Sequence, residues 1–531
     1  MKKNLIGVLM LLAAVLGCMG ELCGWLLPTL SWPFTAAREL PFLHCPGWWI
    51  SPLAAEGQFN WFGWLCMLVL AVAGIVVLLR SKDSLRLPPE QVMRWRRFRS
   101  LRRGFWSLMI LLGIVLLAAL DQCLVGKRAL AVEYGGEWYF PAFSRAVIPG
   151  SVFGLQGNDA PAEANYRKLK ASVGTPGGPT CVIMPLVAYA PTMDVVPFPT
   201  EELPLQGGKL LTHDGRAPFN GTACRLYEDG LPHLRIRYRN GYAEGRAQGW
   251  DRDRREVASI TYKRGRMKDY TYTGEGSIFD FLKQTPEDKL QRILYHPAPP
   301  FSGGHLLGTN SRGTDILAYL YGGLQVNIKA ALFYLPAIYL VGLTIGMVMG
   351  YFGGKVDLVT QRIIEVFSQI PFLFAVMILS GFVPAELRGM FLILSLLAMF
   401  GWMHITYLVR TATMKVRSRD YVAAAQVMGA GPLYIMRCHI LPNLTGIIIT
   451  LMPFSIAALI LALASLDYLG FGLPETYPVW GRLLNDGLSN LSCPWVVSSA
   501  FFALVTLLLL VTFIGEGIRE AFDPRRNTYY E

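Results

Sequence analysis

Residue types that catalyse reactions do not form a recognised catalytic motif in this sequence. No GxxxxGK(S/T) stretch is present, so the chain has no loop of its own to cradle the phosphates of a nucleotide. The patterns HExxH and GxSxG are also missing, and the seven histidines are scattered. The nine cysteines show no CxxC spacing, which argues against a zinc site. We therefore expect this chain to be no enzyme and to bind no metal or cofactor.

The residues with the most informative spacing lie between 419 and 443, in the stretch RDYVAAAQVMGAGPLYIMRCHILPN. Ser418 and Asp420 are suitable N-caps for a helix that Gly429 and Pro432 would end. One apolar face, with i, i+3, i+4, i+7 spacing, is formed by Tyr421, Ala424, Ala425 and Met428. A short loop between apolar segments has little core of its own. We therefore expect this face either in the groove of a partner protein or flat against the chain's own helices or lipid headgroups.

The composition is typical of a membrane protein with several spans. Of the 531 residues, 53% are hydrophobic and 16% are charged, and the mean hydropathy is +0.37. About 20 apolar residues are needed to cross a hydrocarbon core of roughly 30 Å. The stretches that meet this requirement are 4–26, 61–80, 104–126, 327–350, 363–382, 389–409, 444–466 and 496–516. The first also has the basic start of a signal peptide, and we favour an uncleaved helix.

The distribution of charge predicts the orientation of these spans. A formal net charge of +12 could indicate nucleic-acid binding, but the basic residues cluster in short loops beside apolar segments, where lysine and arginine mark the cytoplasmic side. Residues 80–103 hold nine Lys/Arg and two acids and are therefore predicted to be cytoplasmic. Alternation then places 127–326 and 467–495 outside, and 410–443 and the C-terminus inside. We expect no nucleic-acid partner.

The region 127–304 is polar, rich in Tyr, Val and Arg and interrupted by Gly and Pro, so it predicts an extracytoplasmic domain containing β-strands. Cys181 and Cys224 both lie in it and either form a disulfide or stay free. A spacer or docking surface is favoured over a ligand-binding module.

Part of this region, about 214–273, contains an internal repeat with a period near 24 residues. The stretch that begins FNGTACRLYEDG returns loosely as AEGRAQGWDRDR, and Tyr238-Arg-Asn-Gly241 corresponds to Tyr262-Lys-Arg-Gly265. The repeat resembles MORN-type repeats. It predicts stacked β-hairpins, each burying one face on the next.

The segment 411–443 resembles the coupling loop of ABC-importer permeases. In that loop two alanines, a glycine four positions after the second, and a Leu-Pro pair twelve positions further on form a helix and its return. The matching residues here are Ala424, Ala425, Gly429, Leu441 and Pro442. Ala423 takes the place of the family's glutamate. The resemblance implies that the helix 420–429, with Asp420, Tyr421 and Met428, docks on a separate ATPase and transmits its movement.

Three further stretches resemble dipeptide, oligopeptide and nickel permeases. The first, HLLGTNSRGTDILAYLYGG at 305–323, keeps the motif residues Gly308, Thr309, Gly313 and Asp315. The others are GYFGGKVDLVTQRIIEVFSQIP at 350–371 and ASLDYLGFGLPETYPVWGRLLNDG at 464–487. The resemblance covers 305–526. A weaker upstream similarity is to the long-loop subgroup related to the microcin C importer.

The resemblance implies an all-α polytopic membrane protein with an inserted β-rich domain. Its six-helix core would consist of 104–126 and five spans within 305–526. Two extra helices lie in 1–80, and the basic linker 81–103 follows them. The implied setting is the bacterial inner membrane, with the large domain in the periplasm and the C-terminus in the cytoplasm. The implied partners are ATPase subunits that hold ATP and Mg, a second permease, a solute-binding protein and the lipid bilayer.

Peptides or peptide-like compounds are the implied substrates. Ionisable groups within spans are costly and often functional. Asp121, Lys329 and Asp467 all lie near outer helix ends, where anchoring to water is favoured over substrate contact. Asp467 could still attract a peptide amine and mark a substrate path. The glycines at 342, 346 and 350 are suited to close helix packing.

An alternative is a membrane-anchored envelope adaptor with a vestigial permease core and a partner-binding repeat domain. The alanine at 423 is its main support.

Overall fold

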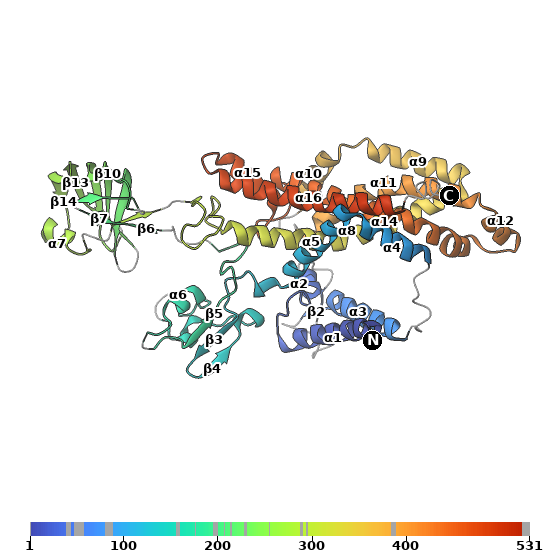
Figure 1. Ribbon diagram of the computed structural model, residues 1–531, viewed down its shortest axis with the longest axis horizontal. Helices are drawn as coiled ribbons and strands as arrows, with labels where there is room; N and C mark the ends of the chain where they lie inside the picture. Colours follow the sequence, from blue (N-terminus) through green and yellow to red (C-terminus); the bar gives the residue numbers. More distant parts are fainter. Residues whose placement is uncertain are drawn as a thin grey trace. The chain divides into compact units, whose positions relative to one another are not determined.

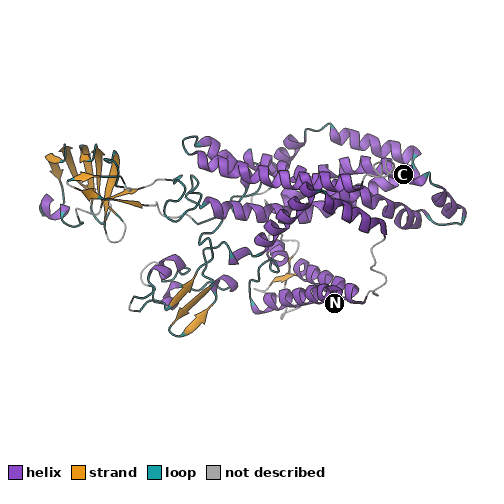
Figure 2. Ribbon diagram, in the orientation of Figure 1, coloured by secondary structure: helices purple, strands orange, loops and turns teal. Residues whose placement is uncertain are grey.

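The computed structural model describes residues 2–38, 44–46, 58–79, 89–155, 160–175, 177–194, 200–206, 208–212, 215–227, 231–253, 255–274, 276–286, 290–293, 296–383 and 389–522. The chain forms two compact units. Unit 1 comprises Met1–Asp194, Ala318–Ser489 and Val497–Glu531, and unit 2 comprises Val195–Leu317 and Asn490–Val496. The long helices belong mainly to unit 1 and the largest sheet belongs to unit 2 (Figures 1 and 2).

Within the described ranges, six helices are long and apolar enough to cross a membrane. They are α3 (Trp61–Leu79), α5 (Arg102–Ala119), α8 (Ile316–Phe352), α11 (Met390–Arg417), α14 (Leu441–Tyr468) and α16 (Pro494–Phe522). Each corresponds to a predicted span, so six of the eight predicted spans are confirmed. Before α5 lies α4 (Pro89–Ser100), in the basic linker, and its buried Phe98 packs against Gly104 and Gly517.

The predicted span 363–382 is not one continuous helix. The segments α9 (Gly354–Ser368) and α10 (Phe372–Phe382) meet at a bend of 77°. Pro371 lies at the break, and a proline disfavours helical geometry in the residue before it and lacks a main-chain donor. The two segments together are long and apolar enough for a broken span or a re-entrant loop, so the span at 363–382 stays a prediction.

The predicted first span is a helix, α1 (Lys2–Cys23), whose described apolar part, Gly7–Cys23, falls short of the length of a full span. It packs along α3, where a Cβ at Gly7 would lie 3.1 Å from the carbonyl oxygen of Gly74. In the sequence, α2 (Trp32–Arg38) and the paired strands β1 (His44–Pro46) and β2 (Gln58–Asn60) come between α1 and α3.

Asp121 and Lys329 join this N-terminal region to the core helices. The indole Nε1 of Trp32 donates a hydrogen bond to Oδ2 of Asp121 at 3.1 Å, and Gln325 Nε2 donates to Oδ1 at 2.9 Å. The Lys329 ammonium lies 4.5 Å from the centre of the Trp32 ring, in a cation–π contact. Both charges therefore make contacts within the protein.

A stripe of glycines lets α8 and α11 pack closely, as the sequence predicts. A Cβ at Gly346 would lie 2.8 Å from the main-chain oxygen of Thr406, and one at Gly350 would lie 2.7 Å from that of Arg410. At Gly342 the neighbour is Ile405, at 2.9 Å. The same helices contribute buried side chains to the main core of unit 1, among them Ala330, Leu394, Leu397 and Val409.

The predicted domain 127–304 is divided between the two units. Its first part, in unit 1, holds a three-stranded sheet in the order β4-β3-β5. The elements are β3 (Ala131–Tyr134), β4 (Glu137–Tyr139), β5 (Cys181–Ile183) and α6 (Tyr166–Ala171). They enclose a small core around Phe153, Tyr166 and Leu169.

The second part, in unit 2, is an eight-stranded antiparallel sheet with the order β14-β13-β12-β10-β9-β15-β6 and β11 beside β10. The strands are β6 (Thr200–Leu203), β9 (Gly221–Leu226), β10 (Pro232–Arg239), β11 (Tyr242–Ala243), β12 (Gly245–Trp250), β13 (Glu256–Lys263), β14 (Arg266–Tyr272) and β15 (Leu290–Ile293). A separate pair is β7 (Leu205–Gln206) and β8 (Lys209–Leu210). The core includes Leu234, Ile236 and Ile260, together with Phe281 from α7 (Ile278–Leu282), which is labelled beside the strands in Figure 1.

The strands of this sheet that come first and last in the sequence, β6 and β15, pair with each other. Leu290 pairs with Leu203, and Ile293 pairs with Thr200. The chain therefore enters and leaves the sheet at the same place.

Two tight turns with the same geometry lie at corresponding positions of the predicted repeat, which itself stays a prediction. Asn240 and Gly241 have φ of 51° and 80°, and the corresponding Arg264 and Gly265 have φ of 48° and 80°. Positive φ at both central residues is the geometry of the tight turns that favour β-hairpins. Cys224 of this sheet and Cys181 of unit 1 are both free cysteines, so the structure does not contain the disulfide that the sequence left open.

We expect the larger sheet to lose stability in acid because of His233. This side chain is fully buried, its Nδ1 lies 2.7 Å from Thr285 Oγ1, and burial, with a contribution from Arg225, lowers its pKa to about 4. In the unfolded chain the histidine has a pKa near 6.5, so it binds a proton there more readily than in the fold. The free energy of unfolding is therefore highest above pH 6.5 and falls by about 3 kcal/mol in total between pH 6.5 and 4. Opening of the sheet should therefore increase about 20-fold from pH 7 to pH 5.

The buried thiol of Cys224 provides the measurement. Its alkylation rate is followed by peptide mass spectrometry on the full chain, in the wild type and in His233→Gln. The ratio of the wild-type rate to the variant rate should rise as the pH falls from 7 to 5. Taking the ratio removes the pH dependence of the thiol itself. A ratio that stays constant from pH 7 to pH 5 would contradict the role of His233.

Candidate functional site

The loop that the sequence marks as a docking element connects α11 to α14. It contains α12 (Asp420–Val427), α13 (Pro432–Ile435) and a π-helical turn (Met436–Ile440). The N-cap of α12 is Arg419, which makes no side-chain capping hydrogen bond, so the prediction of Ser418 or Asp420 as N-cap was wrong. The Ser418 hydroxyl instead donates to the carbonyl of Lys415, and Asp420 lies in the first turn, where its charge favours the helix dipole.

Gly429 ends α12, as predicted. Its φ is +84°, its N–H donates to the carbonyl of Gln426 at 3.0 Å, and the N–H of Ala430 donates to the carbonyl of Ala425 at 3.0 Å. This pair of hydrogen bonds around a left-handed residue is the Schellman motif. Leu441 and Pro442 form the first turn of α14, where a proline costs no hydrogen bond.

One side of the loop is packed on the chain's own core. Val422, Ala425, Ile435 and Ile440 are buried and belong to the same cluster as Val409 of α11. The predicted four-residue apolar face is thus divided, because Ala425 points inward while Tyr421, Ala424 and Met428 are exposed. Ala423 is exposed as well.

The other side of the loop exposes large apolar side chains, which we call the apolar tip. Its members are Tyr421, Val427, Met428, Leu433 and Tyr434. Val427 is 88% and Met428 80% exposed, and large exposed apolar groups gathered in one segment mark interaction sites. Sequence reasoning missed Val427, Leu433 and Tyr434. The sequence shows that these residues are apolar, but only the burial of Val422 and Ile435 in the structure shows which apolar residues of the loop face outward.

The apolar tip is fixed to the long helices. Asn443 at the start of α14 donates to the Tyr421 hydroxyl at 3.2 Å and to the carbonyl of His439 at 2.7 Å. The His439 ring lies 6.2 Å from that of Tyr421 and 5.8 Å from that of Tyr434, measured between ring centres. In Figure 1, α12 lies at one end of the bundle of long helices.

The motif residues of the segment 305–323 build a compact loop in front of α8. Gly308 has φ of +79°, and a Cβ there would lie 2.3 Å from the carbonyl oxygen of Ala298, so only glycine fits. The buried Thr309 hydroxyl accepts a hydrogen bond from the N–H of Ala298 at 2.8 Å and lies 2.7 Å from His296 Nδ1. Gly313 is also left-handed, with φ of +78°.

Asp315 closes this loop. Its Oδ2 lies 2.8 Å from Nδ1 of His305, and both side chains are 2% exposed. The Asn310 side-chain oxygen accepts hydrogen bonds from the main-chain N–H groups of Arg312 and Thr314 at 3.1 Å and 2.8 Å. The four motif residues are therefore brought together, in an arrangement that shapes the backbone before α8.

Asp467 is buried, at 4% exposure. The prediction that this carboxylate reaches water at the end of its span was therefore wrong. Its Oδ1 accepts a hydrogen bond from the N–H of Leu473 at 2.8 Å. A Cβ at Gly472 would lie 1.9 Å from the same oxygen, so the loop runs directly over the carboxylate. Asp467 therefore stabilises the turn that follows α14.

The motif at 464–487 contacts α8 through the start of α15 (Trp480–Ser489). Trp480 Nε1 donates to the carbonyl of Leu320 at 2.9 Å, and a Cβ at Gly323 would lie 2.4 Å from the Trp480 ring. Gly322 likewise faces Pro478, at 2.5 Å. Two motifs more than 140 residues apart in the sequence thus form one contact.

Comparison with known proteins fits this arrangement. Residues 342–528 match the family described as binding-protein-dependent transport system inner membrane component. The inner membrane ABC transporter permease protein YejE of Escherichia coli is 31% identical over 83% of this chain and 99% of its own length. The chain belongs to the ABC transporter permease family. The permease is also 38% identical to a peptidoglycan transport system permease protein YejE of Agrobacterium fabrum, over 41% of this chain and 57% of that one.

A third relative is the oligopeptide transport system permease protein OppC of Haemophilus influenzae, which is 31% identical over 43% of the permease and 73% of its own chain. The matched family region contains the loop with the apolar tip, the three glycines of α8 and the Asp467 turn. The permease is thus a multi-pass inner-membrane protein, and the loop with the apolar tip lies inside the family region.

Proposed function

We propose that this permease is the membrane subunit of an ATP-driven importer of peptides or peptide-like compounds, and that the apolar tip is its contact with a separate ATPase. The observation that carries the proposal is the two-sided loop. Its inner residues belong to the core of the long helices, while its outer residues expose large apolar groups. The substrate class rests on the names of two relatives, a peptidoglycan and an oligopeptide transport system permease.

In this mechanism the loop transmits movement without deforming. The Schellman turn at Gly429 fixes the end of α12, and the Asn443 contact fixes Tyr421 to the first turn of α14. Displacement of the tip by ATPase closure would therefore tilt α14 and the helices packed on it. A loose loop would absorb the same displacement, because local rearrangement costs less than moving a packed helix.

The partners in this proposal are two ATPase subunits that hold ATP and Mg, a second permease subunit, and a solute-binding protein. The loop with the apolar tip and the C-terminus would face the cytoplasm, and both parts of 127–304 the periplasm. The basic residues of α4 and of the last turn of α11, Lys415 and Arg417, support this orientation. We propose that Asp467 shapes a turn and that the coupling residues are those of the loop.

A charge placed on the apolar tip should uncouple the importer. We expect the double substitution Val427→Asp, Met428→Glu to lower co-purification of the ATPase and uptake of a labelled oligopeptide by more than 10-fold. The physical reason is that a desolvated charge in an apolar interface costs several kcal/mol. The amount of permease in the membrane should stay the same, because both side chains are exposed in this chain.

Leu491→Glu is the matched control, since Leu491 is similarly exposed, at 74%, in the turn before α16. It should leave uptake and ATPase retention unchanged. Normal ATPase retention in the double variant would refute the docking role of the tip. Retained ATPase with lost uptake would instead assign the tip to a later step.

A further inference from the structure

The motif at 350–371 forms the corner between α8 and α9. The N–H of Gly353 donates to the carbonyl of Met349 at 3.0 Å, and Gly353 and Gly354 have φ of +62° and +54°, so the chain turns here. Ile364 is the only buried residue of α9, a helix that lies wholly within the described ranges. Little apolar surface therefore holds α9 to its neighbours, and its position depends on polar contacts.

An ion pair attaches α9 to α11. The Arg410 guanidinium of α11 donates to both carboxylate oxygens of Asp357, in the first turn of α9, and its Nη2 lies 2.5 Å from Oδ2. These side chains are 22% and 13% exposed. A bidentate contact of this kind fixes orientation as well as distance. Another ion pair of α9, between Arg362 and Glu365, lies within the helix and is more exposed, at 72% and 36%, so it attaches α9 to no other element.

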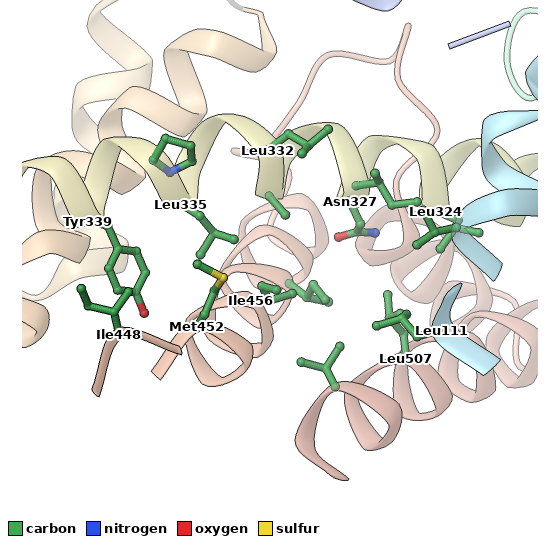
Figure 3. A pocket seen from close by; sticks show the side chains of 16 residues that line it. Leu111, Leu324, Asn327, Leu332, Leu335, Tyr339, Ile448, Met452, Ile456 and Leu507 are labelled. Atoms are coloured by element: carbon green, nitrogen blue, oxygen red, sulfur yellow. The ribbon is translucent and has the colours of Figure 1, made fainter. Parts of the chain in front are cut away.

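The same corner contacts the loop with the apolar tip. Tyr351, in the last turn of α8, is buried, and its hydroxyl accepts a hydrogen bond from Gln426 Nε2 of α12 at 3.4 Å. The Arg417 guanidinium lies 5.9 Å from the centre of the Tyr351 ring. Further along α8, an apolar groove of about 490 Å³ lies between α8 and α14 (Figure 3). The corner thus connects the loop to α8 and α9 by a path that does not pass through α14.

We propose that Asp357 and Arg410 are positioning residues that make α9 move with α11 when the apolar tip is displaced. The inference rests on the proposed function, in which an ATPase displaces the tip. The glycines of α8 join it to α11, and the ion pair joins α9 to α11, so the three helices move together. Without the ion pair, α9 keeps the buried contact of Ile364 and no longer follows α11. ATP hydrolysis then continues without import.

The substitutions Asp357→Asn and Arg410→Gln, alone and combined, test the proposal. The full importer, with its ATPase, is reconstituted in vesicles, and the measured quantity is the number of ATP molecules hydrolysed per labelled oligopeptide taken up. Each single variant should raise this ratio about 10-fold, because the partner that remains is left without its opposite charge. The double variant should raise it no further, since both substitutions remove the same contact, whereas independent roles would multiply to about 100-fold.

Glu365→Gln is the matched control, because it breaks the other ion pair of the same helix and should leave the ratio unchanged. Arg410→Lys keeps the charge but loses the bidentate contact, so it should raise the ratio about 3-fold and provides a milder variant should Arg410→Gln not fold.

A purely structural ion pair would lower the amount of permease and leave the ratio constant, which would overturn the proposal. Losses that multiply in the double variant would overturn it too. A wild-type permease that retains no ATPase would refute the proposed function itself, and this inference with it.

Discussion

Valine in place of Gly429 is expected to lower peptide uptake by more than 10-fold while the amount of permease in the membrane stays the same. Gly429 has φ of +84°, a conformation that costs an L-residue roughly 1–2 kcal/mol and a β-branched residue more. The turn would relieve this strain by rearranging, which breaks the hydrogen bonds from Gly429 and Ala430 that close α12. No atom lies within 4 Å of the new Cβ, so the effect is on the backbone alone and the long helices are left intact.

Gly431→Val is the matched control for this experiment. Gly431 lies two residues away, has extended geometry with φ of −70° and ψ of 156°, and also has nothing within 4 Å of a Cβ. It should transport normally. Gly429→Asn should be intermediate, because asparagine tolerates left-handed geometry better than valine. Uptake is measured with a labelled oligopeptide and the amount of permease by immunoblot. Normal uptake in Gly429→Val would refute a coupling role for this turn.

Gly346→Val is expected to prevent correct packing of the membrane helices. Its Cβ would lie 2.8 Å from the main-chain oxygen of Thr406 and 2.8 Å from Val409, so α8 and α11 must separate. Overpacking of this kind typically costs 1–3 kcal/mol, and more when backbone rather than a side chain must move. We expect a marked fall in the yield of monodisperse protein in detergent and a lower unfolding temperature in the fraction that remains.

The control is Gly113→Val in α5, where a Cβ meets no atom within 4 Å. Both substitutions place the same β-branched residue in an apolar helix, so the loss of glycine and the helix propensity of valine are matched. A Gly346 variant as stable as the Gly113 variant would show that α8 and α11 do not depend on their close approach.

Those parts of the fold that follow local rules could be predicted from the sequence. Apolar length alone located α3, α5, α8, α11, α14 and α16, because a helix is the simplest way for a single segment to satisfy its main chain in lipid. The spacing of the glycines in α8 predicted a close helix contact, and the corresponding Asn-Gly and Arg-Gly pairs predicted two hairpin turns. Each of these features is determined by residues near one another in the chain.

The parts that depend on distant neighbours were not predicted correctly. The inward direction of Ala425 is set by Val409 and the rest of the core, which the spacing within α12 cannot reveal. Asp467 was expected near water because it ends a span, but the turn through Gly472 folds over it. The 77° bend between α9 and α10 is an exception, because its cause, Pro371, is local and is not visible in hydropathy alone.

The pairing of β6 with β15 has a consequence for how this protein can be altered. Thr200 and Ile293 lie opposite each other, roughly 5 Å apart between their Cα atoms. The sheet is therefore joined to the rest of the chain through two adjacent strands. Excising everything between them and joining the ends with a short Gly-Ser bridge changes no spacing in the flanking polypeptide. We therefore expect a chain without this sheet to keep its membrane-spanning helices folded.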